Sequence, residues 1–163
     1  MREILFRGKR KDNGEWDGEW VFGDLIRNLI YDGREKEMRI GDIYFEHNGD
    51  IHGTAVYKVV PETVGQFTGL TDKNYKKIFE GDILKIVSSV KGGLVENTRF
   101  FESEKRIDCA VVLQDNKTGG YRLNVYNKGK YKRNSKFTKG NLICYEAEVI
   151  GNIYDSPELL EKL

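Results

Sequence analysis

Apolar and polar residues alternate with a period of two along most of the chain, and this alternation predicts strands. It is present in the runs GEWVFGDLI, RIGDIYFEH, IHGTAVYKVV, KKIFEGDILKIVSSV, CAVVLQD, YRLNVYN and LICYEAEVIGNIYD. Asn13-Gly14 and Asn48-Gly49 fall between such runs, and Asn-Gly in that position favours a β-hairpin. No internal segment keeps a helical period over three turns. The pattern therefore predicts a mainly β fold of antiparallel strands.

The C-terminal segment SPELLEKL is the one stretch that favours a helix. Ser156 suits the N-cap, and Pro157 suits the first helical position because its missing N–H costs nothing there. Eight residues are too few for a stable isolated helix, so its leucines must dock on the chain's own sheet or on a neighbouring subunit. We therefore consider three leucines as candidate oligomer contacts: Leu159, Leu160 and Leu163.

A glycine followed by Asp or Asn and then an aliphatic residue recurs along the chain, as in Gly81-Asp82-Ile83. Glycine permits a positive φ, and a short Asp or Asn side chain bonds nearby backbone, so this device indicates corners that start strands. The alternative is that Asp24, Asp42 and Asp82 converge as a metal or acid–base cluster. Their spacing carries no ligand signature, and we favour the architectural interpretation.

A chain of 163 residues fits one domain or two very small ones. A boundary near Pro61 would divide a β meander at 1–60 from a barrel-like region with the terminal helix at 61–163; the alternative is one domain, 1–163. The weakly patterned segment 91–107 predicts a long hairpin loop. Aromatic residues make up 12% of the chain, which argues against disorder.

Enzymatic chemistry finds no support in the sequence, so we predict no catalytic residue, no metal and no cofactor. Cys109 and Cys144 lie in apolar runs and at no metal spacing, which favours two small buried hydrophobes. His47 and His52 flank a hairpin tip and leave zinc as an alternative. If that loop has two residues, His52 faces Phe45 and the imidazoles are separated along the strands. No P-loop, nucleophile elbow or dinucleotide-binding motif is present.

Three blocks of the chain resemble the YopX-like proteins of phages and prophages: REILFRG, VGQFTGLTDKNYKKIFEGDILKI and EVIGNIYDSPELLE. The central block is the most specific. Tyr75 departs from the pattern, which has glycine after Asn74, so a wider loop is expected there; Lys9 replaces an aromatic residue. The resemblance implies a mostly β fold with an SH3-like barrel portion and a phage origin, and it implies no reaction. Together with the absence of an apolar signal segment or membrane span, it predicts a location in the bacterial cytoplasm.

The segment 116–145 contains eight basic residues and no acidic one, whereas the rest of the chain carries a net charge of −7. Tyrosines are interleaved with these cations. A loop at 127–130 would bring Tyr126 and Tyr131 together, with Tyr121, Leu123 and Val125 pointing to the other side of the strand. Cations bind phosphates and aromatic rings stack on bases, so the segment fits single-stranded nucleic acid. The candidate residues are Arg122, Tyr126, Lys130, Tyr131, Lys132 and Arg133.

The same charge distribution also suits self-association. A lysine-rich hairpin resists edge-to-edge aggregation, and a basic surface of one copy complements the acidic remainder of another. The sequence therefore predicts a non-enzymatic binding or assembly module that forms a homo-oligomer. Binding of nucleic acid is the alternative, and a host or phage protein is a further candidate partner.

Overall fold

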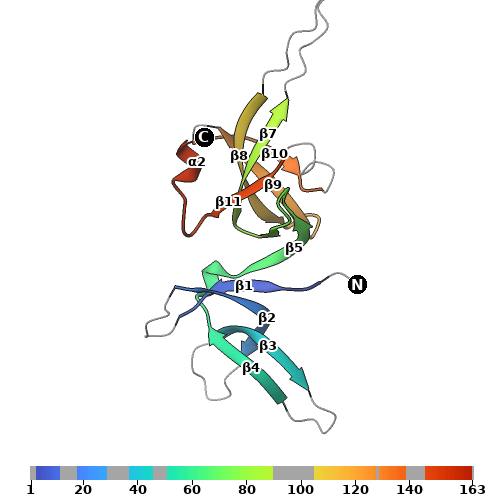
Figure 1. Cartoon of the computed structure of the whole chain (residues 1–163), viewed down its shortest axis with the longest axis vertical. Helices are drawn as coiled ribbons and strands as arrows, with labels where there is room; N and C mark the ends of the chain where they lie inside the picture. Colours follow the sequence, from blue (N-terminus) through green and yellow to red (C-terminus); the bar gives the residue numbers. More distant parts are fainter. Residues whose placement is uncertain are drawn as a thin grey trace, which may run out of the picture. The chain divides into compact units, whose positions relative to one another are not determined.

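A computed structural model describes residues 3–11, 18–28, 37–45, 51–89, 105–127, 129–138 and 146–162. The chain forms two compact units, Met1–Gly69 and Leu70–Leu163. Figure 1 labels their elements. In chain order, they are β1 Phe6–Lys9, β2 Trp20–Asn28, β3 Glu37–Phe45, β4 Ile51–Lys58, η1 Pro61–Thr63, β5 Gly65–Thr71, β6 Lys77–Phe79, β7 Asp82–Ser89, β8 Lys105–Asp115, β9 Gly120–Asn127, β10 Lys130–Lys136, β11 Glu148–Asn152 and α2 Leu159–Lys162.

The first unit is an antiparallel sheet in the order β4-β3-β2-β1-β5. Its described core includes Ile40 and Val59, both fully or almost fully buried. Gly8 packs directly beneath them, since a Cβ at Gly8 would lie 3.1 Å from each of these two side chains. A larger residue would have to displace the core, so glycine is required here for close packing.

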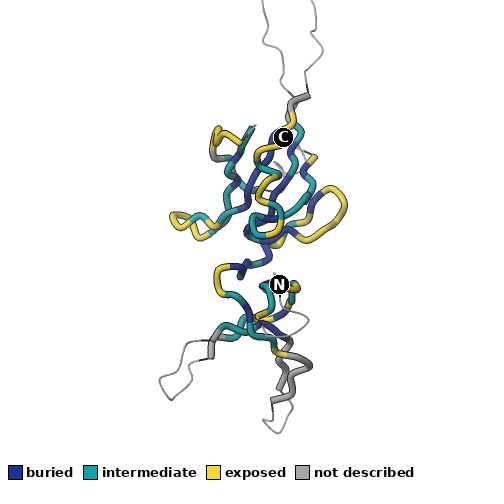
Figure 2. Tube along the Cα trace, turned by 90° about the vertical axis from the view of Figure 1, so that its left-hand side faces the viewer, coloured by how far each residue is buried: buried dark blue, intermediate teal, exposed yellow. Residues whose placement is uncertain are grey.

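The second unit contains a five-stranded antiparallel sheet in the order β10-β9-β8-β7-β11. Apolar side chains of β8 fill both of its faces: Ala110 and Val112 belong to one buried cluster, Cys109 and Val111 to another. This explains the unbroken apolar run CAVVL. Figure 2 shows burial along the central strands of this unit and exposure at its turns.

The prediction of a mainly antiparallel β fold with a short C-terminal helix is confirmed. Among the described strands no pairing joins β10 to β11, so the second sheet is open and barrel-like is a loose description. The β7–β8 hairpin is present, and β8 begins at Lys105, inside the predicted loop 91–107. The predicted boundary near Pro61 stays a prediction.

Two of the predicted corners are architectural. Gly81 has φ of +82°, and the buried Asp82 carboxylate accepts a hydrogen bond from the Phe79 N–H at 2.8 Å, where β7 begins. Asn152, the last residue of β11, accepts the Tyr154 N–H through Oδ1 at 2.9 Å, as expected for an Asx turn. Gly23-Asp24 and Gly41-Asp42 instead lie inside β2 and β3, so the prediction that each corner starts a strand is wrong there.

Candidate nucleic-acid interface

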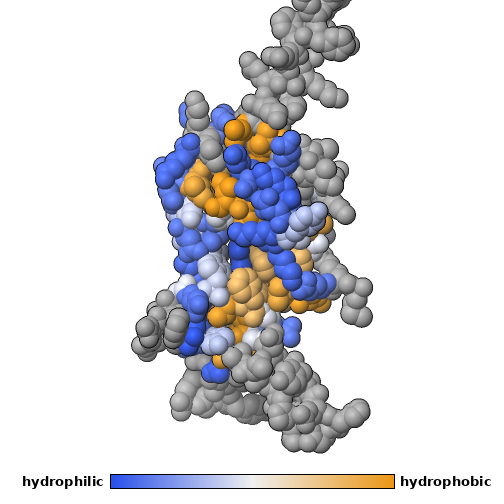
Figure 3. Space-filling model, viewed as in Figure 1, coloured by the Kyte–Doolittle hydropathy of each residue, from blue (hydrophilic) through white to orange (hydrophobic). Residues whose placement is uncertain are grey.

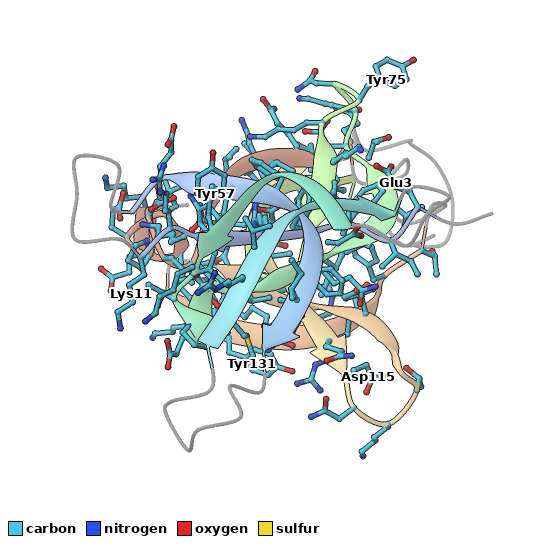
Figure 4. All side chains as sticks on the ribbon, turned by 90° about the horizontal axis from the view of Figure 1, so that it is seen from below. Glu3, Lys11, Tyr57, Tyr75, Asp115 and Tyr131 are labelled. Carbon is cyan, nitrogen blue, oxygen red and sulfur yellow. The ribbon has the colours of Figure 1, made fainter. Side chains whose placement is uncertain are left out.

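The predicted binding residues lie on β9 and β10, and β10 is an edge strand of the second sheet. Tyr126 and Tyr131 are directly opposite each other across the hairpin. Their ring centroids are 5.9 Å apart at an interplanar angle of 74°, which is an edge-to-face arrangement. The predicted proximity of the two rings is thus confirmed, and Tyr131, labelled in Figure 4, keeps 52% of its surface exposed.

The predicted alternation along β9 is also confirmed. Tyr121, Leu123 and Val125 belong to one cluster, and Tyr126 packs against the other. Period two is a local property of extended backbone, so this assignment needs no knowledge of the sheet order.

The cations of the hairpin differ in their exposure. Lys130, Lys132 and Arg133 are exposed on β10, and the ladder shifts register between Tyr131 and Arg133. An irregularity of this kind places consecutive cations on a locally bent edge. Arg122 is half-buried, and its Nε is buried without a hydrogen-bond partner in the described structure. The hairpin therefore combines three exposed cations with one half-buried guanidinium.

The turn at the other end of β9 holds one carboxylate. The Asp115 carboxylate, labelled in Figure 4, accepts the Lys117 N–H at 3.1 Å and the Thr118 hydroxyl at 2.9 Å. These hydrogen bonds lower the pKa of Asp115, and the nearby charges of Arg122 and Lys117 lower it further. The Asp115 charge is therefore offset by the two cations beside it.

The C-terminal tail packs against the Tyr126 side of this sheet. Leu159 and Leu160 pack against the cluster formed by Ile83, Cys109 and Val111. The Gly129 N–H donates to the Leu160 carbonyl at 2.9 Å, so the tail also holds the β9–β10 turn. Figure 1 shows α2 beside this sheet, and Figure 3 shows apolar side chains gathered around it.

Two of the three leucines considered for oligomer contacts therefore dock on the chain's own sheet, which was one of the two arrangements that their pattern allowed. Leu163 lies outside the described residues. A role of these leucines between subunits stays a prediction.

The other candidate clusters gain no support in the described part of the chain. No group of three His, Cys, Asp or Glu side chains there is placed to hold a metal ion. His47 lies outside the described residues, and His52 is opposite Tyr44, because β3 ends at Phe45 and β4 resumes at Ile51. This register is not the one that a two-residue loop gives, and the expected pairing of His52 with Phe45 does not form. Cys109 is a free, buried thiol, as predicted, and Cys144 is not among the described residues.

The first unit carries a cation–aromatic surface that the sequence analysis missed. The guanidinium carbon of Arg7 lies 4.7 Å from the centre of the Trp20 ring, and Lys9 Nζ lies 5.7 Å from it. Arg10 lies in the same way over Tyr57, at 4.5 Å, in a contact between the end of β1 and β4. The alternation of side chains in FRGK and in WVF could have indicated this surface. It does so only when the pairing register of β1 and β2 is known, because that register decides which side chains share a face.

The fold and the hairpin define a small, mainly β protein with a basic, tyrosine-bearing sheet edge. The chain belongs to the YopX family, because the model of that family, described as YopX protein, matches residues 6–161. Among solved structures, it is similar to protein EF1440 from Enterococcus faecalis, with 20% identity, a TM-score of 0.56 and coverage of 99% of this chain and 100% of that chain. That similarity shows a shared fold. No curated protein matches the chain significantly.

No helix in the described part of the chain is long and apolar enough to span a membrane.

Proposed function

We propose that the protein is a non-enzymatic nucleic-acid-binding protein of phage or prophage origin, acting in the bacterial cytoplasm, whose β9–β10 hairpin binds single strands. The observation that carries this proposal is the exposed Tyr131 ring, supported edge-to-face by Tyr126 and flanked by cations on the same edge strand. Every base has a π-face, so a ring of this kind binds bases without regard to sequence.

Three exposed cations of β10 are suited to binding phosphates. Lys130, Lys132 and Arg133 would each neutralise a phosphate and release a counterion, so affinity should fall as salt rises. For about three such contacts on a single strand, the slope of log K against log salt would be about −2. Arg122 is half-buried and its Nε is buried, so it is the least accessible of the four cations.

The test is fluorescence anisotropy of labelled single-stranded and duplex oligonucleotides at two salt concentrations. We expect saturable binding that prefers the single strand and weakens steeply with salt. Tyr131→Ala should weaken it about tenfold, and the pair Lys132→Gln, Arg133→Gln should flatten the salt slope by about 1.4.

A matched control removes two exposed lysines outside the hairpin, Lys76→Gln and Lys117→Gln. This pair changes the net charge equally and should leave the slope unchanged. Equal effects of the two double variants would mean that net charge alone drives the binding, and the proposal would then be wrong.

Self-association is the second candidate function, and the strongly uneven charge favours it. The 116–145 segment carries +8 against −7 for the remainder. Two copies of the lysine-rich β10 edge repel each other, so the contact would join β10 of one copy to an acidic surface of the next. Light scattering should then detect an oligomer that dissociates as salt rises. A monomer at both low and high salt would exclude this arrangement.

A further inference from the structure

One face of the β1–β2 hairpin carries cations and aromatic rings in direct register. Arg7 is opposite Phe22, and Lys9 is opposite Trp20. Since side chains two residues apart share a face, all four lie on the same side of the sheet. The opposite side carries the core, where Gly8 packs against Ile40 and Val59. On the first side Arg7 is buried, with 8% of its surface exposed, whereas Phe22 is exposed.

The rings on this face differ in how they are held. Trp20 is half-buried and has the Arg7 guanidinium over its ring at 4.7 Å. Phe22 keeps 53% of its surface exposed. The face therefore presents an exposed phenyl ring two residues from a half-buried, cation-supported indole.

The same face continues onto β3 and β4. Arg39 is opposite Lys58, and by register this pair belongs to the face that carries Phe22. Asp24 is exposed two residues beyond Phe22, and it separates Phe22 from this pair because Arg39 is opposite Ile26. The cations directly beside the two rings are therefore Arg7 and Lys9.

From this arrangement we infer that the β1–β2 face is a second binding surface for single-stranded nucleic acid, with Trp20 and Phe22 stacking on successive bases and Lys9 binding phosphate. Two rings at alternate positions of one strand are about 7 Å apart, in line, as two unstacked bases require. An acidic peptide would use the cations but would gain little from two aligned rings. This inference rests on the proposed function for the class of ligand, single-stranded nucleic acid. Its binding residues are on β1 and β2, whereas those of the proposed function are on β9 and β10.

The test uses the full chain, with oligo(dT) and an abasic oligomer of the same length as probes. Phe22→Ala should weaken binding to oligo(dT) about tenfold and leave binding to the abasic oligomer unchanged, while Phe22→Trp should keep or improve it. Lys9→Gln should weaken both probes, and Asp24→Asn should strengthen both. Ile4→Ala is the matched control, because Ile4 is an exposed apolar residue of the same unit without a ring.

Photo-crosslinking with a halogenated uracil at one position of the probe locates the bound oligonucleotide on the wild-type protein. The result does not depend on the stability of any variant. A crosslink to the peptide that contains Trp20 and Phe22 is expected. Wild-type affinity of Phe22→Ala for oligo(dT) together with no such crosslink would overturn the inference, as would equal competition by polyglutamate.

The two proposals fail separately. If Tyr131→Ala loses affinity and Phe22→Ala does not, the hairpin alone binds the strand and the inference is wrong. If only Phe22→Ala loses affinity, the β1–β2 face is the binding surface and the proposed role of the hairpin is wrong.

Discussion

The carboxylate of Asp72 accepts the backbone N–H of Val149 at 2.9 Å, across 77 positions of the sequence. Its other oxygen accepts the N–H groups of Asn74 and Lys76 at 2.8 and 2.9 Å, and the side chain is almost entirely buried. One residue thus closes the β5–β6 turn and attaches it to β11. A buried carboxylate with three backbone donors is satisfied as fully as water would satisfy it.

Replacing Asp72 should therefore destabilise the second unit. Asp72→Ala leaves three donors without their acceptor and should lower the free energy of unfolding by about 2–3 kcal/mol. Asp72→Asn keeps one oxygen acceptor and should lose less. Urea denaturation followed by circular dichroism measures both changes.

The control is Asp115→Ala, which removes an exposed turn carboxylate whose hydrogen bonds are local. It should cause a clearly smaller loss than Asp72→Ala. If both variants unfold at the same urea concentration, then the link between Asp72 and Val149 does not hold β11 in place.

Tyr75 stores backbone strain that glycine would remove. Its φ is +64°, a conformation that an L side chain adopts at a cost, and 85% of its surface is exposed. Tyr75→Gly should stabilise the protein by about 0.5–1 kcal/mol, the strain relieved less the chain entropy of glycine.

Tyr75→Ala separates the two contributions, because it removes the ring and keeps the strain. It should be no more stable than the wild type in the same thermal and urea measurements. A stabilised alanine variant would show that the exposed ring, rather than φ, is what destabilises this turn.

The pair formed by Lys73 and Glu148 gives the stability a predictable pH dependence. Lys73 Nζ lies 2.6 Å from Glu148 Oε2, and this hydrogen bond lowers the pKa of Glu148 below 4.5 and raises the pKa of Lys73 above 10.5. The glutamate contribution is present above pH 4.5 and is lost as the pH falls through its lowered folded value. The lysine contribution is present below pH 10.5 and is lost as the pH rises through its raised folded value.

Glu148→Gln should therefore reduce stability at neutral pH by a small amount, since both partners are at the surface. The difference from the wild type should vanish as the pH falls into the acid range, and it should shrink in high salt. Denaturation midpoints from pH 3 to pH 7 provide the measurement, with the exposed Glu158→Gln as control. A difference that persists at pH 3 would mean that the variant perturbs packing instead of charge.

The thiol of Cys109 reports whether the tail docks within one chain. Burial raises the pKa of Cys109, and Sγ donates to the Leu159 carbonyl at 3.5 Å. In a Cys144→Ser background, Cys109 should react slowly with a disulfide reagent at pH 8. Leu160→Ala should accelerate the reaction severalfold by loosening α2.

The dependence on protein concentration separates the two origins of this protection. A tail that docks on its own sheet protects Cys109 equally at all concentrations. Protection that weakens on dilution would mean that the tail comes from another subunit.

Tyr126 and Tyr131 show what local pattern predicts well. Their proximity follows from alternation and a short turn, both of which act within a few residues. The packing of Tyr126, Leu159 and Leu160 against one buried cluster could not be predicted in this way, since the fold alone brings these residues together. The same holds for the Arg7–Trp20 contact, which needs the strand register.

By itself, the sequence determined that the chain forms antiparallel strands, that Gly81-Asp82 starts one of them, and that a short helix ends the chain. Backbone conformation and side-chain alternation depend on neighbours within a few positions, so these features are local. Only the tertiary structure decided that Asp72 binds Val149, that the leucines cover Cys109, and that Arg7 and Lys9 meet Trp20. Those contacts depend on which strands become neighbours, and that choice is made by the burial of apolar surface across the whole unit.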